Sequence, residues 1–150
     1  MISLEGDKEL AFPQAAVWAK LTDLNFLVDC LPDRGDTAVL TKDRAELVIH
    51  PQIAFLKGKL NVNISKQQEQ APNLSQLLLE SKGIGSSSTV VATFTLSGEG
   101  DKTNMHWKAE VQQLGGLLKA VPTGFLKGAA QKVIGDILTS VEKKLGAATA

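Results

Sequence analysis

The chain has 150 residues, of which 43% are hydrophobic, and its 16 basic and 16 acidic residues give no net charge. This length suits one domain, residues 1–150, with a single core. The balanced charge and the 5% aromatic content argue against a nucleic-acid binder. Cys30 is the only cysteine, which excludes an internal disulfide and fits a reducing cytosol. With no signal-peptide pattern and no run of about 18 apolar residues, we expect a cytoplasmic protein.

The first elements that the sequence predicts are one strand and two short helices. Leucine and phenylalanine side chains within residues 2–12 indicate the strand. A helix is expected over residues 15–21 and a second over 24–30. Thr22 or Asp23 can cap the second helix, because short oxygen-bearing side chains accept hydrogen bonds from the first free N–H groups.

Six further strands are expected between residues 38 and 113. The first two form a hairpin over residues 38–41 and 44–49, with Ile53 and Phe55 continuing its second arm. Apolar side chains then recur at every second position, which is typical of a sheet with one buried face. The four strands with this pattern span residues 59–70, 73–82, 86–97 and 103–113.

After Gly116 the apolar period changes from two to that of a helix. The spacing of Leu126, Ala130, Val133, Ile137 and Val141 predicts a long helix over residues 117–145. Pro122 should kink or restart it. Gly124, Gly128 and Gly135 fall near one another on the helical wheel. Close approach of the sheet or of a ligand explains them, and so does a packing seam of small residues.

This order of elements is that of the helix-grip fold, an α+β fold. A curved antiparallel sheet of about seven strands wraps around a long C-terminal helix, and two short helices follow the first strand. Such a sheet and helix tend to enclose a cavity for a small hydrophobic ligand. Trp107 should point into the concave face, where its ring could form a wall. Ordinary core packing is the alternative for the whole expected lining set: Trp18, Leu60, Val62, Leu77, Leu79, Phe94, Met105, Trp107, Phe125, Ala129, Val133 and Ile137.

We find no catalytic or metal-binding set in the sequence. His50 and His106 alternate with apolar neighbours, so both should face outward, and neither has a partner at metal-ligand spacing. Cys30 has no base near it in sequence, which favours a buried structural thiol over a nucleophile. The sequence therefore predicts no cofactor, no metal and no enzymatic activity.

Several short motifs together resemble one known family. They are Pro13 with Trp18, Asp23 and Cys30-Leu31-Pro32, then Lys57-Gly58-Lys59, Gly83-Ile84-Gly85-Ser86, Thr103 with Trp107, and Gly115-Gly116. Over roughly residues 2–145 the chain resembles the CoxG family of carbon monoxide dehydrogenase subunits, within the START and Bet v 1-like (SRPBCC) superfamily. It departs from that family at Asp33, where glycine is frequent, and at Ile137 and Leu138, where an aromatic residue is frequent.

The resemblance implies an accessory role rather than catalysis. It implies non-catalytic binding of a lipid or quinone in the cavity, in the service of a carbon monoxide dehydrogenase-like molybdenum hydroxylase. Peripheral membrane contact is among the roles that it suggests. Two alternatives stay open: a protein-interaction or assembly factor without a ligand, and a cyclase- or hydratase-type enzyme, which would need acid–base groups inside the cavity.

Overall fold

A computed structural model describes residues 2–31, 34–50 and 58–149, with side chains to residue 146. The predicted continuation of the hairpin through Ile53 and Phe55 lies outside the described residues. The described elements are β1 (Ile2–Leu10), α1 (Gln14–Leu21), α2 (Leu24–Cys30), β2 (Arg34–Leu40), β3 (Arg44–Ile49), β4 (Leu60–Gln70), β5 (Leu74–Gly83), β6 (Ser86–Glu99), β7 (Lys102–Gly116), the 3₁₀ helix η1 (Leu117–Ala120) and α3 (Thr123–Thr149).

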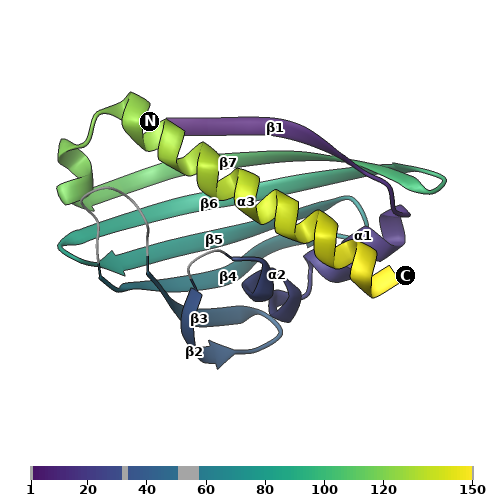
Figure 1. The fold of residues 1–150 in the computed structure, drawn as a ribbon, viewed down its shortest axis with the longest axis horizontal. Helices are drawn as coiled ribbons and strands as arrows, with labels where there is room; N and C mark the ends of the chain where they lie inside the picture. The colour runs from purple at the N-terminus through teal and green to yellow at the C-terminus, as the bar shows by residue number, and fades with distance from the viewer. Residues whose placement is uncertain (1, 32–33, 51–57, 150) are drawn as a thin grey trace.

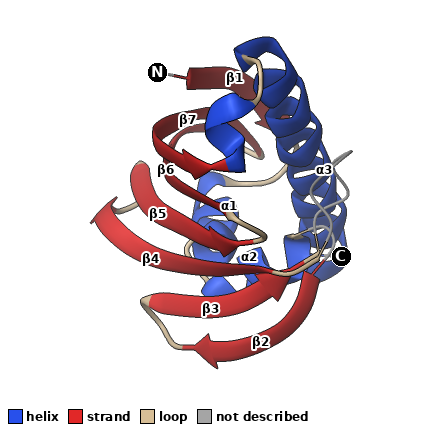
Figure 2. Ribbon diagram, turned by 90° about the vertical axis from the view of Figure 1, so that its left-hand side faces the viewer, coloured by secondary structure: helices blue, strands red, loops and turns tan. Residues whose placement is uncertain are grey.

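The strands form one antiparallel sheet in the order β1-β7-β6-β5-β4-β3-β2. Apolar residues meet across it in register: Leu4 pairs with Ala109, which pairs with Ala92 on the other side. Because side chains alternate between the two faces of a strand, this register gathers the apolar residues on one face. That face curves around α3, as Figures 1 and 2 show. The predicted helix-grip fold is thereby confirmed.

The two short helices form where the sequence predicts them. The side chain of Asp23 caps α2 by accepting a hydrogen bond of 3.0 Å from the backbone N–H of Asn25. In α1, Val17 and Leu21 are buried, and in α2, Leu24, Val28 and Cys30 are buried. Both helices thus turn apolar residues toward the concave side of the sheet.

The long helix begins later than its period predicts. Residues 117–120 form η1, and α3 begins at Thr123, directly after Pro122, which has no N–H to donate and fits this restart. Gly124, Gly128 and Gly135 do not mark a close approach. A Cβ placed on any of them would meet no atom within 4 Å outside the neighbouring helix backbone. The expected packing of the sheet or of a small-residue seam on these glycines is therefore wrong.

Two groups of buried side chains fill the space between sheet and helices. The first joins β1, α1, β6 and β7 to the C-terminal part of α3, with Leu10, Val17 and Leu145 fully enclosed. The second joins α2 to β3, β4 and β5, around Leu24 and Ala45. The two groups adjoin beneath the middle of α3.

Gly116, which closes β7, requires glycine for two reasons. Its φ of 61° is a conformation that L side chains rarely adopt, and a Cβ there would overlap the carbonyl oxygen of Gly85. Gly100 has nearly the same φ, 65°, but its Cβ would meet nothing within 4 Å. We expect Gly100→Ala to lower the free energy of unfolding by about 1 kcal/mol through strain alone. Gly116→Ala should cost clearly more, as measured by urea denaturation; equal losses would contradict the steric argument.

Candidate ligand-binding cavity

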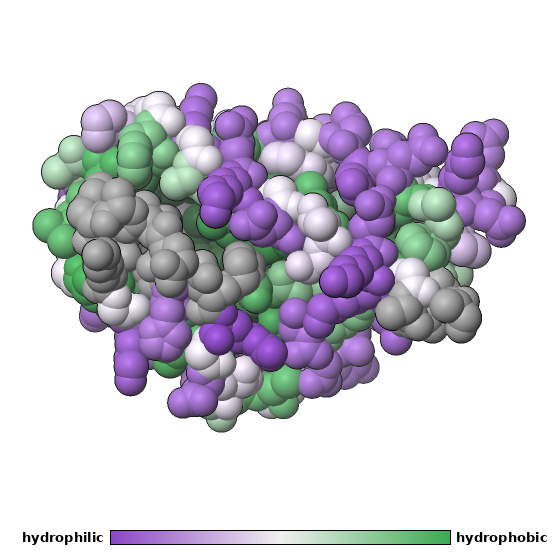
Figure 3. Space-filling model, viewed as in Figure 1, coloured by the Kyte–Doolittle hydropathy of each residue, from purple (hydrophilic) through white to green (hydrophobic). Residues whose placement is uncertain are grey.

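An apolar cavity of about 170 Å³ lies between α3 and the concave face of the sheet, and we call it the inner chamber. It sits where the two core groups adjoin. Apolar side chains from α1, α2, four strands and α3 surround it, including Leu27 of α2, Leu31 directly after that helix, and Ile134 and Leu138 of α3. Figure 3 shows apolar residues in a hollow beside α3, while hydrophilic residues cover much of the helix itself.

Half of the predicted lining residues border the inner chamber. These are Leu77, Leu79, Phe94, Met105, Trp107 and Ile137. Trp18 and Leu60 instead lie partly buried against the first and second core groups, respectively, and Val62 belongs to the second group itself. Ala129 is half-buried and does not border the chamber, while Phe125 and Val133 are 46% and 38% exposed.

The helical residues separate for a geometric reason. Phe125, Ala129, Val133 and Ile137 follow one another at intervals of four, and each such step turns about 40° past a full helical turn. Phe125 therefore points about 120° away from Ile137. The chamber is bordered instead by Ile134, Ile137, Leu138 and Val141, which mix steps of three and four.

The sequence reasoning also missed the contribution of α2. Leu24, Leu27, Val28 and Leu31 follow the 3–4 spacing of an amphipathic helix, a signal that was available. Leu27 and Leu31 border the inner chamber, and Leu24 and Val28 pack in the second core group. The small residues Ala92 and Ala109, paired in register, also border the chamber and leave part of its volume empty.

Trp107 forms a wall of the chamber because its neighbour on β1 is glycine. Gly6 pairs with Trp107 in register, and a Cβ on Gly6 would lie 2.8 Å from Cζ2 of the indole and 3.2 Å from its Nε1. The ring therefore lies against the bare backbone of β1. Its N–H edge is beside Gly6, so the orientation that we expected for a ligand hydrogen bond is not the one that this contact favours.

The side chains facing the inner chamber carry no acid–base chemistry. Thr93 and Lys108 also border it, but they pair in register at positions that alternate with the inward-facing residues, so their side chains belong to the opposite face. Cys30 is buried and does not border the chamber, and burial raises the pKa of its thiol, which keeps it protonated. No titratable side chain of the described residues therefore faces the inner chamber.

Both histidines are on the outside. His50 is exposed. His106 lies on the outer face of β7, with Nδ1 3.1 Å from a carboxylate oxygen of Asp7 and Nε2 3.5 Å from one of Glu5. Asn104 donates a hydrogen bond of 3.3 Å to the same oxygen of Asp7. The hydrogen bonds from His106 and Asn104 hold the pKa of the Asp7 carboxyl below its usual range.

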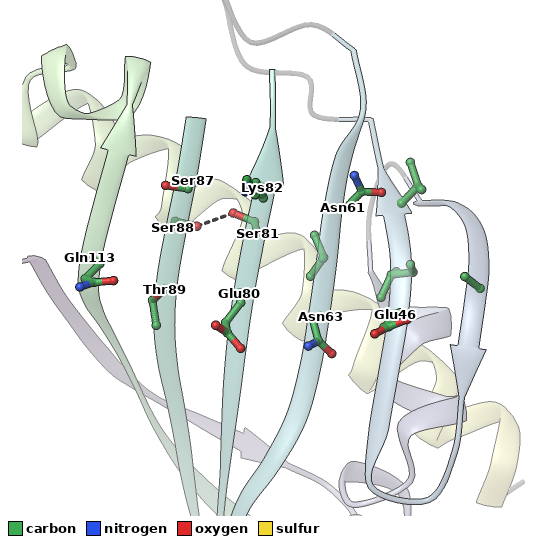
Figure 4. Close-up of a pocket in the computed structure, with 14 residues that line it drawn as sticks. Glu46, Asn61, Asn63, Glu80, Ser81, Lys82, Ser87, Ser88, Thr89 and Gln113 are labelled. Atoms are coloured by element: carbon green, nitrogen blue, oxygen red, sulfur yellow. Dashed lines mark hydrogen bonds between the residues drawn. The ribbon is translucent and has the colours of Figure 1, made fainter. Parts of the chain in front are cut away.

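The face of the sheet away from α3 carries a polar groove of about 580 Å³. One row of residues in register crosses it from β3 to β7: Glu46, Asn63, Glu80, Thr89 and Gln113. Figure 4 shows these side chains with α3 behind the strands. The sheet therefore separates this groove from the inner chamber. Sequence reasoning missed it, although the polar positions between the apolar ones gave the signal.

The fold of this chain is that of the START-like helix-grip proteins. It is similar to a conserved protein from Geobacillus kaustophilus, with a TM-score of 0.87, 22% identity, and coverage of 97% of this chain and 95% of that one. A START superfamily protein from Mycobacterium smegmatis has a TM-score of 0.73 at 12% identity, covering 96% and 97% of the two chains.

A protein family follows from the sequence itself. The model of the CoxG family of carbon monoxide dehydrogenase subunits matches residues 6–146, and the chain belongs to that family. The predicted family is thereby confirmed. No curated protein matches the chain.

Two absences among the described residues bear on the character of the site. None of their helices is long and apolar enough to cross a membrane. No group of three or more histidine, cysteine, aspartate or glutamate side chains in the same part of the chain could hold a metal ion.

We expect Gly6→Ala to displace the indole of Trp107, because the added Cβ overlaps the ring. Overpacking of this kind typically lowers the free energy of unfolding by about 1–3 kcal/mol. In a Trp18→Phe background, the fluorescence emission of Trp107 should shift relative to the parent. Gly100→Ala, whose Cβ meets nothing, serves as the control. An unchanged emission spectrum would contradict the contact.

The hydrogen bonds to Asp7 predict how it titrates. Because its folded pKa is lowered, the carboxylate contributes stability that is present above its ordinary value of 3.8 and is lost as pH falls through the folded value. Removing the imidazole hydrogen bond with His106→Ala should raise the pKa of Asp7 toward 3.8, measured by carboxyl-carbon NMR. His50→Ala, distant in sequence and also exposed, should leave it unchanged, and a similar response in both variants would refute the pairing.

Proposed function

We propose that this protein binds a hydrophobic small molecule, a lipid or a quinone, without catalysing its conversion. It does so as a cytoplasmic accessory protein of a carbon monoxide dehydrogenase-like molybdenum hydroxylase. The observation that carries the proposal is the inner chamber, an apolar space enclosed by the sheet, α2 and α3. The family to which the chain belongs supports the association with the oxidoreductase.

The volume of the inner chamber limits what it can hold. An engineered protein cavity of about 150 Å³ binds benzene, so 170 Å³ accepts one ring or a short stretch of hydrocarbon chain. Burial of an apolar group of that size contributes roughly 1.5–3 kcal/mol. The chamber therefore suits one apolar end of a larger molecule.

A cyclase or hydratase needs acid and base groups that reach its substrate. His106 is engaged with carboxylates on the outer face, and His50 is exposed. The side chains that surround the inner chamber can exclude water and hold a hydrocarbon group by contact. These properties support binding over catalysis at this site.

One observation favours the second candidate, a protein-interaction or assembly factor. Large apolar side chains are exposed at η1 and in the first half of α3: Leu117 is 51% exposed, Phe125 46% and Val133 38%. Apolar residues of this kind are common at protein and membrane contacts. Handing a bound molecule to an oxidoreductase also needs such a contact, so the two functions can share this end of the protein.

A substitution that fills the inner chamber tests the proposal. Ala92→Phe places a ring in the space that a ligand would take, so the affinity for cis-parinaric acid or decylubiquinone should fall about tenfold or more. Thr95→Phe, on the same strand but exposed on the outer face, is the matched control. Fluorescence titration measures the first probe and calorimetry the second. Wild-type protein that takes up neither probe would refute ligand binding.

A further inference from the structure

A second cavity, of about 380 Å³, lies at the end of the sheet where β7 leads into η1, and we call it the outer chamber. Its apolar walls include Ile2 of β1, Val111 of β7 and Leu126 of α3. Unlike the inner chamber, it is also lined by polar residues that can donate hydrogen bonds. These are Gln112, Lys119 and Thr123, all exposed.

The two chambers follow one another beneath α3. On β7, Ala109 borders the inner chamber, and the next inward-facing residue, Val111, borders the outer one. Two residues of a strand span roughly 7 Å. On α3, Ile134 borders the inner chamber and Leu126 the outer one, with the same order along the helix. Together the chambers reach the size range of natural small-molecule sites, roughly 300–1,000 Å³.

A β-bulge places Gln112 at the outer chamber. Val111 pairs with Val90 and Gln113 with Thr89, so Gln112 is an extra residue without a partner on β6. Bulges interrupt the strict alternation of side chains and re-aim the side chain of the inserted residue. The irregularity in β7 thus lies where the apolar walls end and the polar ones begin.

We propose that the two chambers hold a single amphiphilic molecule. Its apolar end fills the inner chamber, and its head, which accepts hydrogen bonds through a carboxylate or a carbonyl, lies in the outer chamber beside Gln112, Lys119 and Thr123. This inference rests on the proposed function and adds the orientation and the head-group chemistry of the ligand.

The reverse orientation is disfavoured by the lining of the inner chamber. A carboxylate or carbonyl placed there would lose its water without gaining a hydrogen bond from a side chain. In the outer chamber, the ammonium group of Lys119, the amide of Gln112 and the hydroxyl of Thr123 are all donors. Lys119 favours an anionic head, whereas Gln112 and Thr123 serve a neutral carbonyl as well.

Two probes that differ only in the head test this orientation: cis-parinaric acid and its methyl ester, each titrated by fluorescence. For a carboxylate head, Lys119→Met should weaken binding of the acid about tenfold and of the ester at most about threefold. For a neutral carbonyl head, Lys119→Met or Gln112→Leu should weaken both probes alike. Lys127→Met, an exposed lysine that borders neither chamber, is the control and should change neither affinity.

The outcomes separate this inference from the proposed function. If the wild-type protein binds both probes and Ala92→Phe weakens both, but neither Lys119→Met nor Gln112→Leu changes either affinity, the orientation is refuted and ligand binding stands. If the wild-type protein binds neither probe, the proposed function itself fails. Circular dichroism of each variant verifies the fold, which substitutions at these exposed positions should preserve.

Discussion

The attachment of the C-terminal part of α3 to the first core group is the contact on which the rest of the structure depends. Val141 and Leu145 are 2% and 0% exposed, and they pack in the group that contains Leu10 and Val17. Burial of each such side chain contributes roughly 1.5–3 kcal/mol. The nearby ion pair of Lys8 with Glu142, at 3.5 Å and about one-third to one-half exposed, adds little by comparison.

Because α3 is held at that end, its remaining length crosses the concave face at a separation that side chains must fill. The first core group fills the space below its C-terminal part, and the second fills the space above β3, β4 and β5. Between them, Ala92 and Ala109 are too short to close the gap. The inner chamber is thus a consequence of where two cores meet and of which small residues stand there.

The strands were predictable from the sequence and the helix phase was not. Period-two alternation directly reports which face of a strand is buried, so Leu77, Phe94 and Met105 could be placed toward the helices. On α3, several apolar stripes fit the residues, and an interval of four drifts around the helix, which left Phe125 and Val133 exposed. The bulge at Gln112 could not be foreseen, because it depends on the pairing of β7 with β6.

The sheet divides the chemistry of this protein between its two faces. The carboxylates beside His106 and the polar groove lie on the outer face, whereas the inner chamber is bordered by apolar side chains. Any reaction that needs proton transfer would have to reach across the sheet. A molecule held in the inner chamber is therefore shielded from those groups, as a carrier of a reactive or poorly soluble compound requires.

Stability along α3 is uneven, and this bears on how a ligand could enter. Gly124, Gly128 and Gly135 each cost up to about 1 kcal/mol of helix propensity, and no packing contact at their Cα positions offsets the cost. Fully buried residues of α3 occur only toward its C-terminal end among the described side chains. Local opening is easiest where buried contacts are fewest. The end of α3 that borders the outer chamber therefore opens at the lowest free energy, while Val141 and Leu145 keep the helix attached.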